Sequence, residues 1–87
     1  MMFQRKPSHT YIGDVWRDPD NRHDKREEDH SLYFDSETGQ YIVVEEVEQV
    51  SGPNVSCSHT IHTVQEYLKL HPDRREVVEC AIAAHKK

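Results

Sequence analysis

The 87-residue chain has few of the residues that mark several large classes of protein. Its two cysteines, Cys57 and Cys80, are too few for the disulfide framework of a small secreted domain. It has no run of about 18 apolar residues, so we expect no membrane-spanning helix. Its N-terminus lacks the apolar stretch of a secretory signal. These absences predict a cytoplasmic protein with reduced thiols and no contact with a membrane.

The chain also lacks the motifs of common enzymes. Its three glycines form neither a phosphate-binding loop nor a dinucleotide-binding fingerprint. Glu45 and Glu46 are adjacent, so on a strand their carboxylates would point to opposite faces and could not share a substrate. Cys57 and His59 would lie side by side without a third group to orient them. The sequence therefore predicts no enzymatic activity, no catalytic residue and no cofactor.

Strongly apolar residues are scarce as well. Leucine, isoleucine, valine and phenylalanine together number 18, which is about the lower limit for an ordered domain. A domain of about 60 residues buries only about 60% of the surface that its unfolded chain exposes. Residues 41–44 are apolar on both faces of the expected strand. We therefore expect either a homodimer or the aromatic segment 11–16 to cover the second face.

Strand and turn signals are concentrated in the middle of the chain. Gly39 and Gly52 supply the positive φ angle that tight turns demand, and Asp35 is typical of a turn start. Between and beyond these turns the sequence is rich in β-branched and aromatic residues or alternates with period two. The expected elements are strands over 32–34, 40–50 and 55–61, joined by turns over 35–39 and 51–54.

Two short helices should follow these strands. Thr63 and Glu66 match a capping box, in which the threonine begins the helix and the glutamate lies three residues later. Pro72 ends that helix, because the residue before a proline avoids helical angles. A second apolar stripe predicts a helix that closes the chain. The sequence thus predicts an α+β fold, with a three-stranded antiparallel β-meander followed by two short helices packed on one face.

We expect the chain to divide into a flexible or arm-like segment over 1–30 and a β-β-β-α-α domain over 31–87. Within the first segment, 9–16 carries aromatic and aliphatic residues and would form a short strand or a packing arm. Residues 17–30 contain no aliphatic or aromatic side chain. A segment that cannot bury apolar surface does not offset its conformational entropy, which predicts a solvated linker there.

Charge is strongly segregated along the chain. All eleven lysines and arginines lie at or before Arg26 or at or after Lys69, and the stretch between them holds nine acids. A concentrated acidic surface steers toward a basic partner, and the net charge of −5 argues against direct nucleic-acid binding. The leading hypothesis is therefore a non-enzymatic module that docks on a basic protein. The expected contact residues are Asp35, Glu37, Glu45, Glu46 and Glu48.

One version of this hypothesis is an inhibitor that occupies the site of a nucleic-acid-binding protein, as small acidic proteins of phages and mobile elements do. Two alternatives remain. The acids can serve only to solubilise the sheet and keep its edges apart, in a structural domain without a dedicated site. The protein can also be a small zinc-binding protein that uses Cys57, His59 and Cys80 with His85. Cys57 and His59 are the only close pair among these ligands, and free cysteines are commonly buried core residues, so no metal site is assigned.

Overall fold

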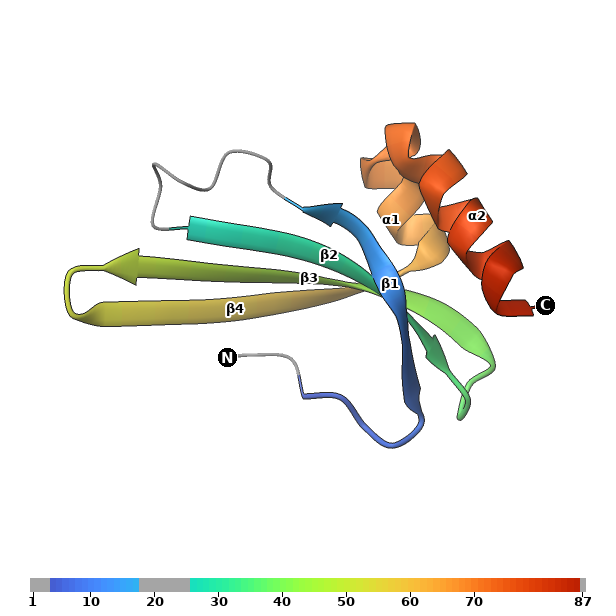
Figure 1. Cartoon of the computed structure of the whole chain (residues 1–87), viewed down its shortest axis with the longest axis horizontal. Helices are drawn as coiled ribbons and strands as arrows, with labels where there is room; N and C mark the ends of the chain where they lie inside the picture. The colour runs from blue at the N-terminus through green and yellow to red at the C-terminus, as the bar shows by residue number, and fades with distance from the viewer. Residues whose placement is uncertain (1–3, 18–25, 87) are drawn as a thin grey trace.

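The structure, a computed structural model, describes residues 4–17 and 26–86. In this described part, four strands form one antiparallel sheet in the order β1-β2-β3-β4. Helices α1 and α2 pack on one face of that sheet, near one end (Figure 1). The elements are β1 (His9–Arg17), β2 (Arg26–Asp35), β3 (Gln40–Ser51), β4 (Asn54–Thr63), α1 (Val64–Leu70), the 3₁₀ turn η1 (Pro72–Arg74) and α2 (Arg75–Lys86).

The α+β class is confirmed, and the predicted number of strands is wrong. The described sheet has four strands rather than three, because residues 9–17 form β1 along the edge of β2. Within the described residues, no helix has the length and apolar character needed to cross a membrane. The short-strand alternative for the aromatic segment is therefore the correct one.

The turns follow the local signals in the sequence. Gly39 has φ of 71° and Gly52 has φ of 59°, in the left-handed region that glycine adopts without strain. At the first turn, the Asp35 carboxylate accepts a hydrogen bond from the Glu37 N–H at 3.0 Å. The Thr63 hydroxyl accepts one from the Glu66 N–H at 3.2 Å and so begins α1. These short-range contacts explain why both hairpins and the helix start were predictable.

The solvated linker predicted over 17–30 is wrong at both ends. Arg17 is the last residue of β1, and residues 26–30 begin β2, paired in register with 45–49 of β3. The rest of that prediction, over 18–25, lies outside the described residues. Strand pairing needs backbone hydrogen bonds rather than apolar side chains, so a polar segment can extend a sheet that no helix covers.

The sheet consequently has two unlike halves. The covered half comprises β1 with residues 30–35, 40–45 and 60–63, and it lies under the helices. The bare half comprises residues 26–29, 46–51 and 54–59, and it projects beyond the helices as the long end of the β3–β4 hairpin (Figure 1). The core lies in the covered half, where β1, β2 and β3 meet the helices. Its buried members are Val15, Leu32, Val43, Tyr67, Leu68 and Val78.

Tyr41 and Val43 face the helices, as expected for one face of a strand that is apolar on both sides. Ile42 and Val44 lie on the opposite face, and Val44 is fully buried within this chain. The homodimer that the sequence suggested for that face stays a prediction.

Candidate functional site

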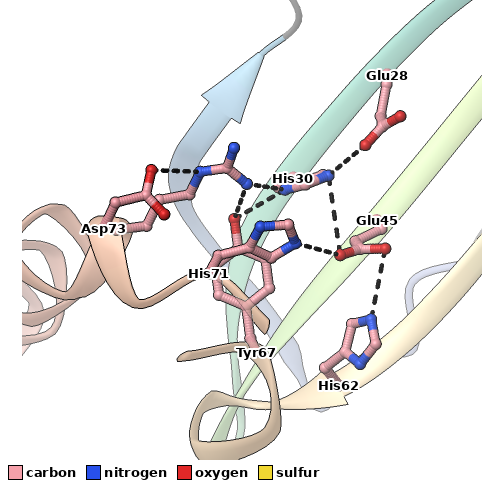
Figure 2. A network of polar contacts seen from close by, with 8 residues as sticks. Glu28, His30, Glu45, His62, Tyr67, His71 and Asp73 are labelled. Atoms are coloured by element: carbon pink, nitrogen blue, oxygen red, sulfur yellow. Dashed lines mark hydrogen bonds and ion pairs between the residues drawn. The ribbon is translucent and has the colours of Figure 1, made fainter. Parts of the chain in front are cut away.

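A buried histidine lies where the covered half of the sheet ends. The His30 side chain on β2 is 1% exposed, and its ring is held at both nitrogens. Nδ1 lies 2.8 Å from the Tyr67 hydroxyl on α1, and Nε2 lies 2.7 Å from a carboxylate oxygen of Glu28 (Figure 2). A buried imidazole with two short polar contacts is fixed in position, which is what a ligand or a relay group requires.

Arg74 of η1 fixes the hydrogen-bonding roles in this group. Its Nη1 lies 3.2 Å from His30 Nδ1 and 3.2 Å from the Tyr67 oxygen. A guanidinium can only donate, so Nδ1 is the acceptor and Nε2–H donates to Glu28. The Arg74 guanidinium also lies 4.6 Å over the Trp16 ring, a cation–π contact. His30 is therefore neutral in this arrangement.

The surroundings of His30 agree with the neutral form. Burial lowers the pKa of His30, the carboxylates of Glu28 and Glu45 act in the opposite direction, and the charge of Arg74 lowers it further. Burial likewise raises the pKa of Tyr67, against the effect of Arg74. The tyrosine hydroxyl thus stays protonated and can donate to His30.

Glu45 is the centre of a second layer of the site. Its Oε1 lies 3.9 Å from His30 Nε2 and 3.4 Å from His71 Nε2, and its Oε2 lies 3.4 Å from His62 Nε2 (Figure 2). The His62 Nε2 atom is buried and makes no hydrogen bond of good geometry. Glu45 and His71 are 21% and 29% exposed. The cluster is therefore reachable from solvent on the His71 side.

Several elements converge to place these groups. His30 and Glu45 are directly opposite each other in the β2–β3 register, so their side chains share one face. His62 lies at the end of β4, opposite Val43 on the same face. His71 is the C-cap of α1, where Pro72 stops the helix and the His71 N–H bonds the Tyr67 carbonyl at 2.8 Å. The helix end thus brings His71 over the two strands.

The arrangement has the donors of a transition-metal site. Ligand atoms of His30, Glu45 and His71 all lie within 4.8 Å of one another, and no other group of this kind occurs in residues 4–17 and 26–86. Ligands about 2.0–2.1 Å from a tetrahedral zinc ion are about 3.3 Å apart. The distances of 3.4 Å and 3.9 Å from Glu45 Oε1 are close to that value. The ligand atoms of His30 and His71 are at most 4.8 Å apart.

The structure does not bring together the metal ligands suggested by the sequence. Cys57 and His59 lie on the face of β4 that points away from the helices, in register with Glu48 and Glu46. Cys80 is exposed on α2. The Nδ1 atom of His85 lies 2.8 Å from the Tyr41 hydroxyl oxygen. The sheet separates the first pair from the second, so these four residues do not form a site.

The five acids expected to bind a partner also occupy separate places. Glu45 belongs to the histidine cluster on the helix side, and Glu46 and Glu48 lie on the other face. Asp35 and Glu37 lie at the β2–β3 turn, at the far end of the sheet, where Asp35 also lies 3.6 Å from His9. They do not form one surface.

Glu46 and Glu48 instead join two acids of β2. Glu27 is directly opposite Glu48, Asp29 is directly opposite Glu46, and these four residues line a shallow hollow beside Cys57. We call them the carboxylate patch. Asp29 is balanced by Arg17 of β1 at 2.9 Å. The patch is the part of the predicted acidic surface that does form.

Of the residues that make the histidine cluster, only Glu45 was predicted from the sequence as a contact residue, and it was assigned to an acidic surface. His30 lies in the segment interpreted as a linker, and no motif linked it to Tyr67, His71 or Arg74. The usable signal was the placement of His71 directly before Pro72, where a helix must end. Comparison with protein families, curated proteins and solved structures finds no match to the chain. The function must therefore be inferred from this geometry.

Proposed function

We propose that the protein binds one divalent transition-metal ion through His30, Glu45 and His71. The observation that carries the proposal is the convergence of two imidazole nitrogens on one carboxylate oxygen, at 3.4 Å and 3.9 Å. Two histidines and one carboxylate, with a position open to solvent, form a ligand set that suits zinc and other ions of the first transition series.

The hydrogen bonds of His30 support this role. A metal ligand needs an unprotonated Nε2, which follows if the ring proton moves to Nδ1. Nδ1 then donates to the Tyr67 oxygen at 2.8 Å, the contact that metal-binding histidines characteristically make with their second nitrogen. Glu28, released from Nε2, can take the fourth position or hold a water there. With its proton on Nδ1, His30 no longer accepts from Arg74 Nη1, which keeps its hydrogen bond to the Tyr67 oxygen at 3.2 Å.

The charge balance also supports a cation. Glu28 and Glu45 bring two carboxylates to the cluster, against the single positive charge of Arg74. The Arg74 guanidinium also contacts the Trp16 ring, and Asp73 lies 3.9 Å from its Nε. A divalent ion would therefore neutralise an excess of negative charge.

An ion at this position would join the sheet to the helices, because His30 and Glu45 are on strands and His71 is at the end of α1. A ligand that binds only the folded state stabilises it by about 2.7 kcal/mol at a concentration 100 times its dissociation constant. Metal binding should therefore be visible as a rise in melting temperature.

The test is calorimetric titration of the full chain, free of any histidine tag, with Zn²⁺. We expect one ion per chain and a higher melting temperature. His71→Ala and Glu45→Gln should each weaken binding more than about 100-fold, since even second-layer partners contribute about 10–100-fold. His59→Ala is the matched control and should bind as the unchanged protein does. Equal affinity in His71→Ala and the unchanged protein would overturn the proposal.

A second function is favoured by the carboxylate patch. Like charges directly opposite each other destabilise a sheet, and Glu27–Glu48 and Asp29–Glu46 are two such pairs side by side. We propose that the patch docks on a basic protein surface of the kind that binds nucleic acid. An arginine-rich peptide is the probe, and its affinity should fall with salt and fall further in Glu46→Gln/Glu48→Gln.

The control for that experiment is Glu66→Gln/Glu76→Gln, which removes two exposed carboxylates from the helices. If both double variants weaken peptide binding equally, the effect is one of net charge and the patch is not a docking site.

A further inference from the structure

The described sheet ends in two edge strands that differ in construction. β1 shifts register twice against β2, between Tyr11 and Gly13 and between Asp14 and Trp16, and α2 packs along it. Such bulges are a device by which proteins make an edge unsuitable for further pairing. The β1 edge is thus protected against another strand.

The β4 edge has no such protection. β4 pairs with β3 without irregularity from Ile42↔Thr63 to Ser51↔Asn54, and in the described residues no strand lies on its other side. In a regular antiparallel strand, alternate residues direct their N–H and C=O groups away from the paired neighbour. Most side chains of β4 are exposed. β4 therefore offers a straight row of backbone donors and acceptors at the edge of the sheet.

The composition of β4 indicates which kind of strand can pair with its free edge. Asn54–Thr63 contains no aspartate, glutamate, lysine, arginine or proline, whereas edge strands are usually guarded by charge or proline. Two β4 strands can therefore approach each other without formal charges in direct opposition. A domain this small also gains by burying more apolar surface. These features fit a second copy of the chain better than a charged partner.

We infer that two copies pair through antiparallel β4 strands about a two-fold axis near Ser58. This register places Val55 of each copy opposite Ile61 of the other, on the face away from the helices. These side chains are 59% and 49% exposed in the single chain. Each dimer would contain two such apolar cross-strand pairs and one continuous sheet. The pairing uses none of the metal-binding residues and does not depend on the metal proposal.

The charge of the molecule adds a further expectation. Each copy has a net charge of −5 and carries its carboxylate patch on the bare half of the sheet. Repulsion between like charges is screened by salt. The dimer should therefore tighten as salt concentration rises, which is the opposite of the behaviour of an association held by ion pairs.

The experiment is sedimentation of the full chain over a range of concentrations and salt. We expect a reversible dimer for the unchanged protein, and a monomer for Val55→Lys/Ile61→Lys. The control Leu70→Lys/Val77→Lys, at helix positions that are 62% and 45% exposed, should remain a dimer. Circular dichroism checks that each variant is folded.

A charge pair tests the register itself. Val55→Glu and Ile61→Lys should each weaken the dimer, and the two together should restore it, because unlike charges then face each other across the axis. Within one chain these positions are about 20 Å apart along the strand, too far to pair. A monomer at all concentrations, a dimer that survives Val55→Lys/Ile61→Lys, or no rescue in the combined variant would each overturn β4 pairing.

Discussion

The covered and bare halves of the sheet share strands β2, β3 and β4, yet their side chains differ. In the covered half, Leu32 and Val43 face the helices and are fully buried. In the bare half, pairing between β2 and β3 continues without a break as far as Arg26↔Gln49, although most of the paired residues are charged or polar. The cover of a helix, rather than strand pairing, decides where this sheet needs apolar residues.

The histidine cluster lies at the boundary between the halves. His30 and Glu45 form a cross-strand pair at this boundary, and most residues beyond them are polar or exposed. A buried polar group is stable only when its partners are in place, and here Tyr67, Arg74 and Glu28 supply them. The cluster thus closes the core at the end where helix cover stops.

Shortening a core side chain should distinguish the halves most strongly. Leu32→Ala removes a fully buried side chain and should lower the free energy of unfolding by about 2–5 kcal/mol. Val55→Ala, at an exposed position of the bare half, should change it by less than about 0.5 kcal/mol. Urea denaturation at protein concentrations below the dissociation constant of the β4 dimer measures both, and similar losses would show that the bare half has a core of its own.

Removing one hydroxyl should test the boundary. Tyr67→Phe removes the oxygen that His30 Nδ1 and Arg74 Nη1 share and leaves only their bond to each other, so it should cost about 0.5–1.5 kcal/mol, the net contribution of a typical hydrogen bond. Tyr41→Phe removes a hydroxyl whose bond to His85 is exposed, and its effect should be smaller. Equal losses in the two variants would mean that the cluster does not contribute to the core.

Reversing a charge in the bare half should stabilise the protein. Glu48→Lys replaces a like-charge pair with Glu27 by an unlike pair and should raise the free energy of unfolding by about 0.2–1 kcal/mol. The gain should shrink as salt increases, and Glu48→Gln should give part of it. A loss of stability at low salt would show that the carboxylate patch is not electrostatically strained.

The smallest effect is expected at the β2–β3 turn, far from the cluster. Burial acts to raise the pKa of Asp35, but hydrogen bonds from Glu37 and Ser8 outweigh it, so the pKa lies below its ordinary value of 3.8. A carboxyl with a lowered folded pKa stabilises the protein above its unfolded pKa, and this stability is lost as pH falls through the folded value. Asp35→Asn keeps the turn acceptor without titrating. Between about pH 5 and pH 2.5 it should therefore lose less stability than the unchanged protein.

Local signals were sufficient to predict the two hairpin turns and the boundaries of the helices. Gly39, Gly52, Thr63 and Pro72 each act through contacts a few residues away, and the helices follow the predicted order. The start of β2 was not predictable in the same way, because its acids and His30 have no apolar periodicity. Its strand conformation comes from pairing with β3.

The candidate site was harder to predict for a related reason. His30 contacts Tyr67 and Arg74, which are 37 and 44 residues away along the chain. No spacing pattern in the sequence predicts contacts over such distances. The sequence identified Glu45 as functional but assigned it to an acidic surface, since its histidine neighbours come from β2, β4 and the end of α1. Which acids share a face depended on a register that the sequence did not supply.

The order of the strands in the sheet affects how fast the protein folds and which parts of it form last. Neighbours in the sheet are neighbours along the chain, so the meander forms through short loops and should fold quickly. The contacts of His30 with α1 and η1 are among the long-range ones, and they can form only when the helices dock. Trp16, the only tryptophan, lies under Arg74 in the docked state. Its fluorescence should therefore report the last kinetic step, in which the core closes and the histidine cluster assembles together.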